Sequence, residues 1–399
     1  MKKDWEIKKL GELCSFIGDG DWIESGDQST EGIRLVQTGN VGEGIYLDKE
    51  NRAHYISEET FTRLKCTEIF PGDCLISRLP EPVGRACIIP DLNQKMITAV
   101  DCTIIRFKEN IQPQYFVYYS QSNKYLSDID SEATGATRKR ISRKNLEKIS
   151  IPIPPLEEQK RIVKILDEKF AQLESLKANA QNNLQNAKDL FQSQLTKAFS
   201  NTTWEKKAIG EVCSKKENIK WKNENISTEY QYIDLSAVDR ESKNISDTQI
   251  ITKESAPSRA QQIVKTGDIL FGTTRPTLKR FCLLADEYDG QICSTGFCVI
   301  RPNQNIISSD WMFYQFYNDE FYKYIEPLQK GANYPAVTDK DIMNYNIFVP
   351  PLPEQKRIVK ELDTLSEKVR QLQEIYTKQI ANCEELKQSL LQKAFEGEL

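Results

Sequence analysis

The sequence predicts an α+β protein in which two similar globular heads are joined by two long antiparallel helices, an intramolecular coiled coil with pseudo-two-fold symmetry. The main observation is a repeated junction. Residues 151–163, Ile-Pro-Ile-Pro-Pro-Leu-Glu-Glu-Gln-Lys-Arg-Ile-Val, return at 347–359 as Ile-Phe-Val-Pro-Pro-Leu-Pro-Glu-Gln-Lys-Arg-Ile-Val. Each copy follows a mixed region of similar length and opens a long run without glycine or proline.

The repeat extends well beyond this junction. Trp5–Ser15 matches Trp204–Ser214, and Gly72–Ser77 matches Gly267–Gly272, at a nearly constant offset. Few insertions separate the copies, so the two heads should share a fold. The copies diverge in between, as at 18–25, and similar frames with different loops suggest one task performed on different targets. Two heads on a common rod suit a target that repeats along a line, as duplex DNA does.

The runs Glu157–Phe199 and Glu354–Phe395 are expected to be helices of about 42 residues, roughly 60 Å long at about 1.5 Å per residue. The prolines before each run suit the end of a strand followed by a first helical turn. Steps of three and four predict a coiled-coil seam in the second run, formed by Ile358, Leu362, Leu365, Val369, Leu372, Tyr376, Cys383, Leu386 and Leu390. The first run has a weaker stripe, Ile162, Leu166, Leu173, Leu176, Ala180, Ala187 and Leu190.

These elements divide the chain into four predicted regions. The first head covers residues 1–153 and the first helix 154–200. The second head covers residues 201–349 and the second helix 350–399. Short strand-like and helix-like runs alternate in both heads, which indicates the α+β class without giving the order of the strands.

Composition favours a globular protein of two or three domains for the 399 residues. No apolar run approaches the roughly 20 residues that span a bilayer, and the start, residues 1–6, has no apolar signal core. We therefore expect a cytoplasmic protein without membrane contact. The ten cysteines are scattered without a Cys-x-x-Cys pair, which favours buried thiols over a zinc site. The net charge of −4 argues against nonspecific coating of nucleic acid but allows local basic patches.

Enzyme signatures are missing from the sequence. His54 is the single histidine, so a catalytic triad or a histidine acid–base site would depend on it alone. Neither a P-loop nor the Asp/Asn-Pro-Pro-Tyr signature of amino-methyltransferases occurs. Gly39–Gly44 has the wrong spacing for a cofactor loop, and a turn explains it. Asp73 and Asp268 each follow a glycine, and a turn before a strand explains both. We expect no catalytic residue, metal ion or cofactor in this chain.

Cationic loops are the strongest candidates for binding. Residues 138–144 hold five cations. Arginine can fork onto guanine edges or phosphates, whereas lysine neutralises phosphate as a point charge. The matching segment of the second head, 329–335, is less charged but offers an asparagine and a tyrosine that can read adenine or stack. The loop 272–280 is also cationic, and its approximate match holds Arg78 and Arg85.

A third candidate is the glycine-flexed loop around residues 19–22. For each loop a structural alternative stays open, either a solvated surface loop or a buried tryptophan with aspartates in turns. The candidate DNA-contacting residues are Asp19, Asp21, Trp22, Arg78, Arg85, Thr134, Thr137, Arg138, Lys139, Arg140, Arg143, Lys144, Thr273, Thr274, Arg275, Lys279, Arg280, Lys330, Asn333 and Tyr334.

Pro-Pro-Leu-x-Glu-Gln-Lys-Arg-Ile-Val occurs twice, each time after a variable region and before a long helix. In this the chain resembles the specificity subunits of type I restriction–modification systems. The resemblance covers essentially the whole sequence, and two copies at this spacing make it specific. It implies that each head is a target recognition domain for one half of a bipartite DNA site. It also implies a non-catalytic subunit whose antiparallel helices set the gap between the two half-sites.

The resemblance also implies partners. These are double-stranded DNA, two methyltransferase subunits and motor-nuclease restriction subunits, with S-adenosylmethionine, ATP and Mg used in the partner subunits. The repeated motif is assigned to architecture and to methyltransferase docking, through Pro155, Leu156, Glu158, Gln159, Arg161, Ile162, Pro351, Leu352, Glu354, Gln355, Arg357 and Ile358. The first helix departs from the family pattern, because a Gln/Asn-rich stretch at 181–186 replaces a strong apolar seam.

Two other functions are compatible with the residues. A two-headed adaptor that grips proteins would suit the acidic isoelectric point of about 5.5. A self-contained DNA-modifying enzyme would have to work without the motifs above. Co-purification with a methyltransferase and sequence-dependent retention of DNA would favour the specificity subunit over the adaptor. Methyl transfer by the purified chain alone would favour the enzyme.

Overall fold

The computed structural model describes residues 4–200 and 203–399. The first three residues of the segment that lacks a signal core, and the predicted boundary at residue 201, lie outside these ranges. The chain forms two compact units: unit 1 combines the sequence up to Ala180 with Lys378–Leu399, and unit 2 is Gln181–Thr377. Each unit therefore holds one head and a part of both long helices. Within the described ranges, no helix has the length and apolar character needed to cross a membrane.

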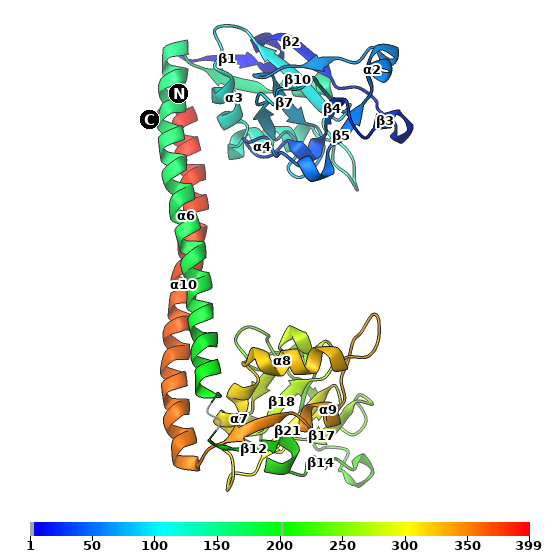
Figure 1. Cartoon of the computed structure of the whole chain (residues 1–399), viewed down its shortest axis with the longest axis vertical. Helices are drawn as coiled ribbons and strands as arrows, with labels where there is room; N and C mark the ends of the chain where they lie inside the picture. Colours follow the sequence, from blue (N-terminus) through cyan, green and yellow to red (C-terminus); the bar gives the residue numbers. More distant parts are fainter. Residues whose placement is uncertain (1–3, 201–202) are drawn as a thin grey trace. The chain divides into compact units, whose positions relative to one another are not determined.

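The head of unit 1 contains two sheets with helices packed against them (Figure 1). The first sheet is antiparallel with the order β2–β10–β7–β8, which are Cys14–Asp19, Cys102–Phe107, Cys74–Ser77 and Ala86–Ile88. The second has the order β3–β5–β4–β9–β6, which are Gln28–Ser29, His54–Ile56, Ile33–Val36, Met96–Thr98 and Glu68–Ile69. The helices are α1 (Leu10–Leu13), α2 (Glu58–Leu64), α3 (Pro113–Tyr119), α4 (Asn123–Glu132) and α5 (Arg143–Leu146).

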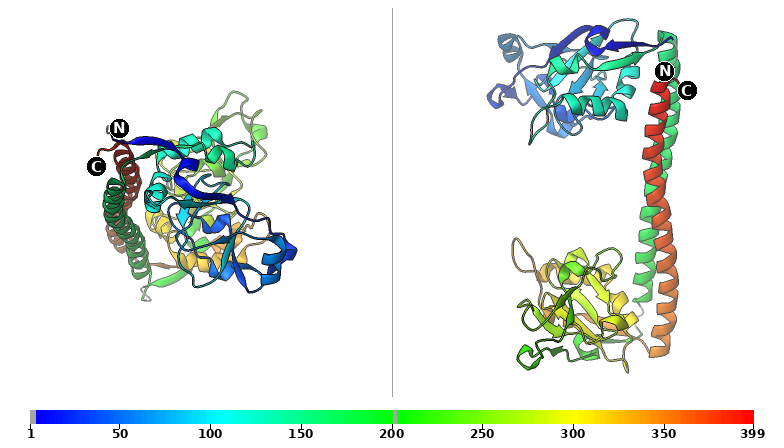
Figure 2. Two further views of the ribbon diagram at one scale, coloured as in Figure 1. Left: turned by 90° about the horizontal axis from the view of Figure 1, so that it is seen from above. Right: turned by 180° about the vertical axis from the view of Figure 1, so that it is seen from behind.

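The head of unit 2 repeats this plan, which can be followed from two further sides in Figure 2. Its first sheet has the order β13–β21–β18–β19, which are Cys213–Ser214, Phe297–Pro302, Ile269–Gly272 and Phe281–Leu283. Its second has the order β14–β17–β20–β15–β16, which are Glu217–Asn218, Ala260–Ile263, Ile292–Ser294, Tyr230–Ile233 and Gln249–Ile251. The helices are α7 (Ser309–Gln315), α8 (Asp319–Ile325) and α9 (Asp339–Met343).

A two-stranded ribbon connects each head to a long helix. β1 (Glu6–Lys9) pairs antiparallel with β11 (Ser150–Ile153), and β12 (Glu205–Ala208) pairs in the same way with β22 (Asn346–Val349). Two prolines follow each ribbon, and the helices α6 (Leu156–Ala198) and α10 (Leu352–Glu396) begin directly after them. The predicted α+β class with two similar heads and two long helices is therefore confirmed.

The two copies share their buried polar contacts as well as their strands. In the first head, Asp73 accepts a hydrogen bond from the main-chain N–H of Phe70 and pairs with Arg106 at 2.9 Å. In the second head, Asp268 accepts from the N–H of Lys265 and pairs with Arg301 at 2.8 Å. Both carboxylates are buried in the turn before a central strand. The turn predicted for these two aspartates is confirmed, and the arginine partner adds a structural reason for the acid.

α6 and α10 pack antiparallel within each unit. In unit 1, Leu166 of α6 and Leu391 of α10 belong to one core cluster, and Lys177 forms an ion pair with Glu384. In unit 2, Leu195 of α6 and Leu362 of α10 share a core. Four leucines predicted in the seam are instead exposed: Leu176, Leu190 and Leu386 are about half exposed, and Leu372 is 37% exposed.

The reason for this difference is a shift in the buried stripe. In α10 the partly buried Gln373 takes the place of Leu372, and the buried positions then pass through Cys383, Leu391 and Ala394, so the stripe begins to shift after residue 369. A four-residue step where the heptad needs three rotates the seam in this way. In α6 the buried face likewise runs through Ala187, Phe191 and Leu195, and it leaves Leu190 exposed.

Candidate nucleic-acid interface

Two neighbouring loops in each head bring most of the candidate DNA-contacting residues together. We call residues 78–85 and 273–280 the strand loops, since they join β7 to β8 and β18 to β19. We call residues 134–140 and 330–336 the bridge loops, since a single β-bridge closes each one, Thr134 with Arg140 and Lys330 with Ala336. The bridge loops lie at corresponding places of the repeat, and Figure 1 shows both among the surface loops of their heads.

The strand and bridge loops contact each other through the same backbone hydrogen bond in both heads. The N–H of Ile141 donates to the carbonyl of Arg78 at 3.2 Å, and the N–H of Val337 donates to the carbonyl of Thr273 at 3.0 Å. Glycine opens each bridge loop with a positive φ, 113° at Gly135 and 102° at Gly331, a conformation in which a Cβ would be strained. One scaffold therefore presents two pairs of loops with different side chains.

The cationic bridge loop of the first head is exposed but partly neutralised. Lys139 pairs with Asp130, and Arg140 pairs with Asp101 at 2.8 Å. Arg143, which follows the loop, lies 3.7 Å from Asp19 and 3.2 Å from Glu147. Arg138 and Lys144 have no ion pair among residues 4–200 and 203–399, so they are the cations of this segment that are free for a phosphate or a base. Thr134 and Thr137 lie in the same exposed loop.

Arg78 and Arg85 have structural positions, which corrects their prediction as DNA contacts. Both are buried. Arg85 donates to the carbonyls of Val41, Leu79, Thr38 and Pro82 at 2.6 to 3.0 Å, so its guanidinium holds main chain together. Arg78 donates to the carbonyl of Val100 and lies 3.5 Å from Asp19, and burial lowers its pKa. The sequence does not indicate which groups pair with Arg78 and Arg85, because most of the carbonyls that accept their hydrogen bonds come from distant segments.

The loop around Asp21 also divides between structure and surface. Asp21 accepts the main-chain N–H of Thr67 at 2.8 Å, and burial raises the pKa of its carboxyl. Asp21 therefore anchors the loop, which agrees with the structural alternative of aspartates in turns. Trp22 does not follow that alternative, because its side chain is 70% exposed. Asp19 faces Arg78 and Arg143, where its charge offsets the cations next to the bridge loop.

In the second head, three candidates form a cluster across the two loops. The guanidinium carbon of Arg275 lies 5.0 Å from the ring centre of Tyr334, and Arg275 Nη2 donates to the carbonyl of Asn333 at 3.1 Å. Tyr334 and Asn333 are exposed on the bridge loop, together with Lys330. Thr274 joins the two loops through a β-bridge to Ala336.

The remaining candidates of this strand loop have partners within the head. Thr273 Oγ1 donates to the carbonyl of Gly296 at 2.9 Å, and Lys279 pairs with Asp319 at 2.6 Å. Arg280 corresponds to Arg85 in the repeat and, like it, donates to the carbonyl of a short 3-10 turn, at Leu235. Arg280 therefore has a partner within the head, and its role as a DNA contact stays a prediction.

Sequence reasoning missed one cation beside this loop. Lys243 lies over the ring of Phe281, 4.3 Å from its centre, and its Nζ donates to the main-chain carbonyls of Arg240 and Lys279. Burial and then the charge of Lys279 lower the pKa of Lys243 to about 8. Its φ of 60° is left-handed. No motif surrounds this lysine in the sequence, so only the fold could show that it lies beside the strand loop.

The docking motif divides into a buried and an exposed set. Gln159 and Gln355 are fully buried and make the same three hydrogen bonds. Gln159 Nε2 donates to the carbonyls of Pro154 and Asn110, and its Oε1 accepts the N–H of Gln112. Gln355 does the same with Pro350, Ile306 and Ser308. These glutamines, and the buried Ile162 and Ile358, hold helix to head, and this corrects their prediction as docking residues.

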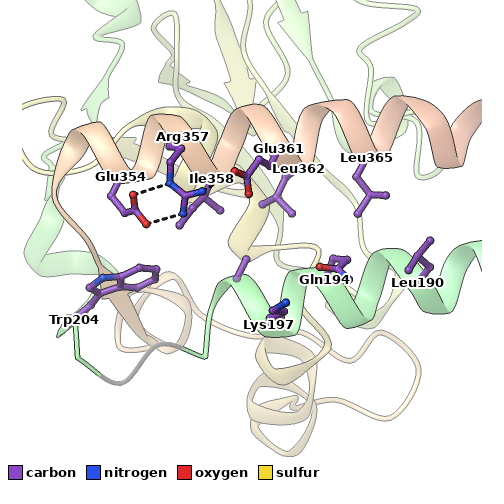
Figure 3. A pocket seen from close by; sticks show the side chains of 11 residues that line it. Leu190, Gln194, Lys197, Trp204, Glu354, Arg357, Ile358, Glu361, Leu362 and Leu365 are labelled. Atoms are coloured by element: carbon purple, nitrogen blue, oxygen red, sulfur yellow. Dashed lines mark hydrogen bonds and ion pairs between the residues drawn. The ribbon is translucent and has the colours of Figure 1, made fainter.

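The exposed set keeps a surface position. Pro155 and Pro351 are exposed, and Leu156, Glu158, Leu352 and Glu354 are partly exposed. Arg161 forks onto Glu158 at 2.7 and 2.8 Å, and Arg357 forks onto Glu354 at 2.9 and 2.8 Å. In unit 2, Glu354, Arg357 and Ile358 line a pocket of about 480 Å³ between the two helices, with Trp204 at one end (Figure 3).

The comparisons with known proteins agree with this geometry. The family model for the type I restriction modification DNA specificity domain matches residues 2–186 and 201–380, one match for each copy of the repeat. The putative type I restriction enzyme MjaX specificity subunit of Methanocaldococcus jannaschii is 22% identical, with 100% of this chain and 94% of the relative covered. The EcoKI specificity subunit of Escherichia coli is 26% identical over 75% of this chain and 68% of the relative.

Solved structures support the same fold. The HsdS subunit from Thermoanaerobacter tengcongensis gives a TM-score of 0.60 at 20% identity, covering 100% of this chain and 98% of that one. A chain from a study of complex assembly and conformational transition of the type I R-M system gives 0.78 at 20% identity, covering 100% and 99%. These relatives are named as specificity subunits of type I restriction enzymes. The chain belongs to the family of type I restriction–modification DNA specificity subunits.

Proposed function

We propose that each head reads one half of a split, asymmetric DNA target and that the long helices set the gap between the halves. The observation that carries this proposal is the pair of loops found at corresponding places in both heads, with different exposed side chains. Arg138, which has no ion pair within residues 4–200 and 203–399, stands on the first bridge loop, whereas Asn333 and Tyr334 stand on the second. Equal scaffolds with unequal loops would give two unlike half-sites, each read in a major groove.

Phosphate contacts add affinity that weakens with salt in this proposal. Within residues 138–144, Arg138 and Lys144 are the cations without a carboxylate partner among the described residues, so they would carry this contribution there. The remaining cations of the segment lie beside Asp101, Asp130, Asp19 and Glu147, which agrees with the acidic net charge of the chain.

The partners follow from the same proposal. The exposed residues of the repeated motif dock two methyltransferase subunits, and motor-nuclease restriction subunits join that complex in the cytoplasm. Adenine methylation and ATP-driven cleavage take place in those partners, with S-adenosylmethionine, ATP and Mg bound there. This chain supplies the DNA recognition and the geometry.

Charge removal at the first bridge loop tests the DNA-reading proposal. We expect Arg138→Ala to lower the affinity of the assembled complex for its target and to reduce the salt slope of binding by about 1. Lys139→Ala is the matched control, because Lys139 already has Asp130 as its partner. The measurement is fluorescence anisotropy between about 50 and 200 mM salt, the range over which phosphate contacts respond strongly. Equal affinity of Arg138→Ala and the unmodified complex at every salt concentration would overturn the assignment.

The methyltransferase complex itself provides the second test. Methylome sequencing of cells with and without this gene should reveal one lost bipartite motif with a fixed internal gap. Retention of a methyltransferase on the tagged chain, with DNA held in a sequence-dependent way, supports the proposal. Retention of proteins unrelated to DNA, with an unchanged methylome, would favour the adaptor instead.

A further inference from the structure

The strand loop and bridge loop of the second head hold one arginine in a fixed orientation. Arg275 lies against the Tyr334 ring at 5.0 Å, and its Nη2 donates to the Asn333 carbonyl at 3.1 Å. Its main-chain N–H donates to the carbonyl of Pro335 at 2.7 Å. The side chain and the main chain of Arg275 are therefore both fastened to the bridge loop. A long side chain held at several points has already lost most of the rotational freedom that binding would otherwise cost.

The backbone at this position is also unusual. Arg275 has a φ of 50° and Lys279 a φ of 52°, on either side of the short 3-10 turn Pro276–Leu278. A residue with a Cβ is strained in this left-handed region, at a cost on the order of 1 kcal/mol or more, whereas glycine would not be. Such strain persists where the surroundings fix it, and it concentrates at binding sites and other functional positions.

Arg275 keeps most of its donors free. A guanidinium has five N–H groups, and one of those of Arg275 goes to Asn333. Within residues 4–200 and 203–399, no carboxylate lies at ion-pair distance from Arg275, although Lys279 of the same loop has Asp319. Tyr334 is 71% exposed. A single exposed aromatic is common on protein surfaces. This one differs because it holds a fixed, unpaired guanidinium.

A planar fork with free donors matches one partner on DNA better than the others. Guanine presents O6 and N7 side by side in the major groove, and arginine binds both at once. A phosphate is also bound by flexible lysines, which need no strained loop or stacking partner. We propose that Arg275, stacked on Tyr334, reads a guanine in the half-site of the second head. This inference rests on the proposed DNA-reading function and adds the base.

The corresponding positions of the first head explain why the half-sites differ. Pro80 occupies the place of Arg275, and Arg138 occupies the place of Tyr334. In the first head a pocket of about 410 Å³ lies between the strand loop, the bridge loop and α4, with Pro80, Thr137 and Ile129 among its lining residues. In the second head, Thr274 bridges to Ala336 and the N–H of Arg275 reaches Pro335, so more backbone contacts join the two loops there. The stacked arginine thus belongs to one head, and its guanine belongs to one half-site.

The test uses the full complex with its methyltransferase, and a DNA panel with each target position changed in turn. In the unmodified complex, one half-site contains a guanine whose replacement weakens binding about tenfold or more. We expect Arg275→Lys to remove this discrimination while leaving the salt slope unchanged, since lysine keeps the charge but loses the fork. Tyr334→Phe should keep the discrimination, and Tyr334→Ala should weaken it. Lys340→Ala removes an exposed charge from α9, outside both loops, and should leave base preference unchanged.

The outcomes separate the inference from the function on which it rests. If Arg275→Lys and Arg275→Ala keep full preference for every base, Arg275 reads no base. If Arg275→Ala weakens all sequences equally and lowers the salt slope by about 1, Arg275 binds a phosphate. Both results overturn the inference alone. If the unmodified complex shows no sequence preference, the proposed function fails instead. The melting temperature of each variant identifies loss of folding, and Arg275→Lys, which keeps size and charge, provides the decisive comparison in that case.

Discussion

Gln159 and Gln355 explain at the residue scale why Glu-Gln-Lys-Arg recurs in the sequence. Each buried amide satisfies two main-chain carbonyls and one N–H where a ribbon ends, a helix begins and the head returns. Glutamate could accept the N–H but could not donate to the carbonyls. The resemblance predicts both an architectural and a docking role for this motif. The structure gives the glutamine to architecture because its partners come from segments that no local pattern joins to it.

Gln159→Ala should therefore destabilise unit 1. The change leaves buried main-chain groups without partners, each at about 1–3 kcal/mol, so we expect a loss of about 3 kcal/mol or more in the free energy of unfolding. Gln355→Ala should do the same in unit 2. Gln371→Ala is the control, because the Gln371 amide makes an exposed hydrogen bond to Glu367. Urea denaturation measures all three. A Gln159→Ala protein as stable as Gln371→Ala would contradict this role.

Lys243 gives a prediction on pH. Its pKa of about 8 in the folded chain lies below the usual value of 10.5, mainly because of burial. The folded state loses this proton first, so between pH 8 and 10.5 the unfolded chain binds more protons. The contribution of Lys243 to the free energy of unfolding consequently rises with pH across this window.

The pH profile of amine labelling, followed by mass spectrometry, measures this pKa directly. Lys243 should reach half of its maximum rate near pH 8. Lys323 is the comparison in the same head, because its hydrogen bond to Glu320 raises its pKa. The labelling midpoint of Lys243 should lie below that of Lys323 both in the unmodified chain and in Phe281→Leu. Identical midpoints for Lys243 and Lys323 would refute the burial effect.

At the element scale, the long helices were predictable but their register was not. Runs without glycine or proline, and prolines just before them, predicted both helices to within a few residues of the observed ends. The seam departs from the prediction after residue 369, and near the end of α10 the buried positions are those that pack against the first head. Leu391 and Phe395 of α10 belong to the core that contains Tyr115 and Tyr119 of α3. The positions that a helix buries depend on such neighbouring side chains. The hydrophobic periodicity of one segment carries no information about these neighbours.

Leu391→Ala and Leu386→Ala test this register on the same helix. Leu391 is fully buried, so its truncation should cost about 2–5 kcal/mol. Leu386 is 50% exposed, so its truncation should cost less than about 1 kcal/mol, although the sequence predicted it in the seam. Leu195→Ala and Leu190→Ala form the equivalent pair on α6. Denaturant unfolding of the four variants measures the costs. Equal costs within a pair would restore the register predicted from the sequence.

At the scale of the whole molecule, the sequence predicted the repeat and the number of heads. It did not predict which parts of the chain fold together. The boundaries predicted from the sequence assign residues 154–200 and 350–399 to two separate helical regions. In the structure, residues 378–399 belong to unit 1, and residues 181–198 belong to unit 2 with the head that follows them. This assignment depends on contacts such as Phe395 with Tyr119 at 5.0 Å and Phe199 with Trp311 at 4.9 Å, which join distant segments.

Removal of residues 378–399 should therefore weaken the head that lies far away in sequence. The deletion takes Leu391, Ala394 and Phe395 from the core cluster of unit 1, to which all three belong, and leaves the core cluster of the second head complete. Hydrogen exchange followed by mass spectrometry should show faster exchange in α3 (Pro113–Tyr119) and unchanged exchange in α7 (Ser309–Gln315). Phe395→Ala should produce the same pattern in milder form if the deletion causes aggregation. Phe199→Ala should reverse it, since Phe199 packs on Trp311. Faster exchange in α7 after the deletion would mean that the second head, and not the first, depends on the last helical turns of α10.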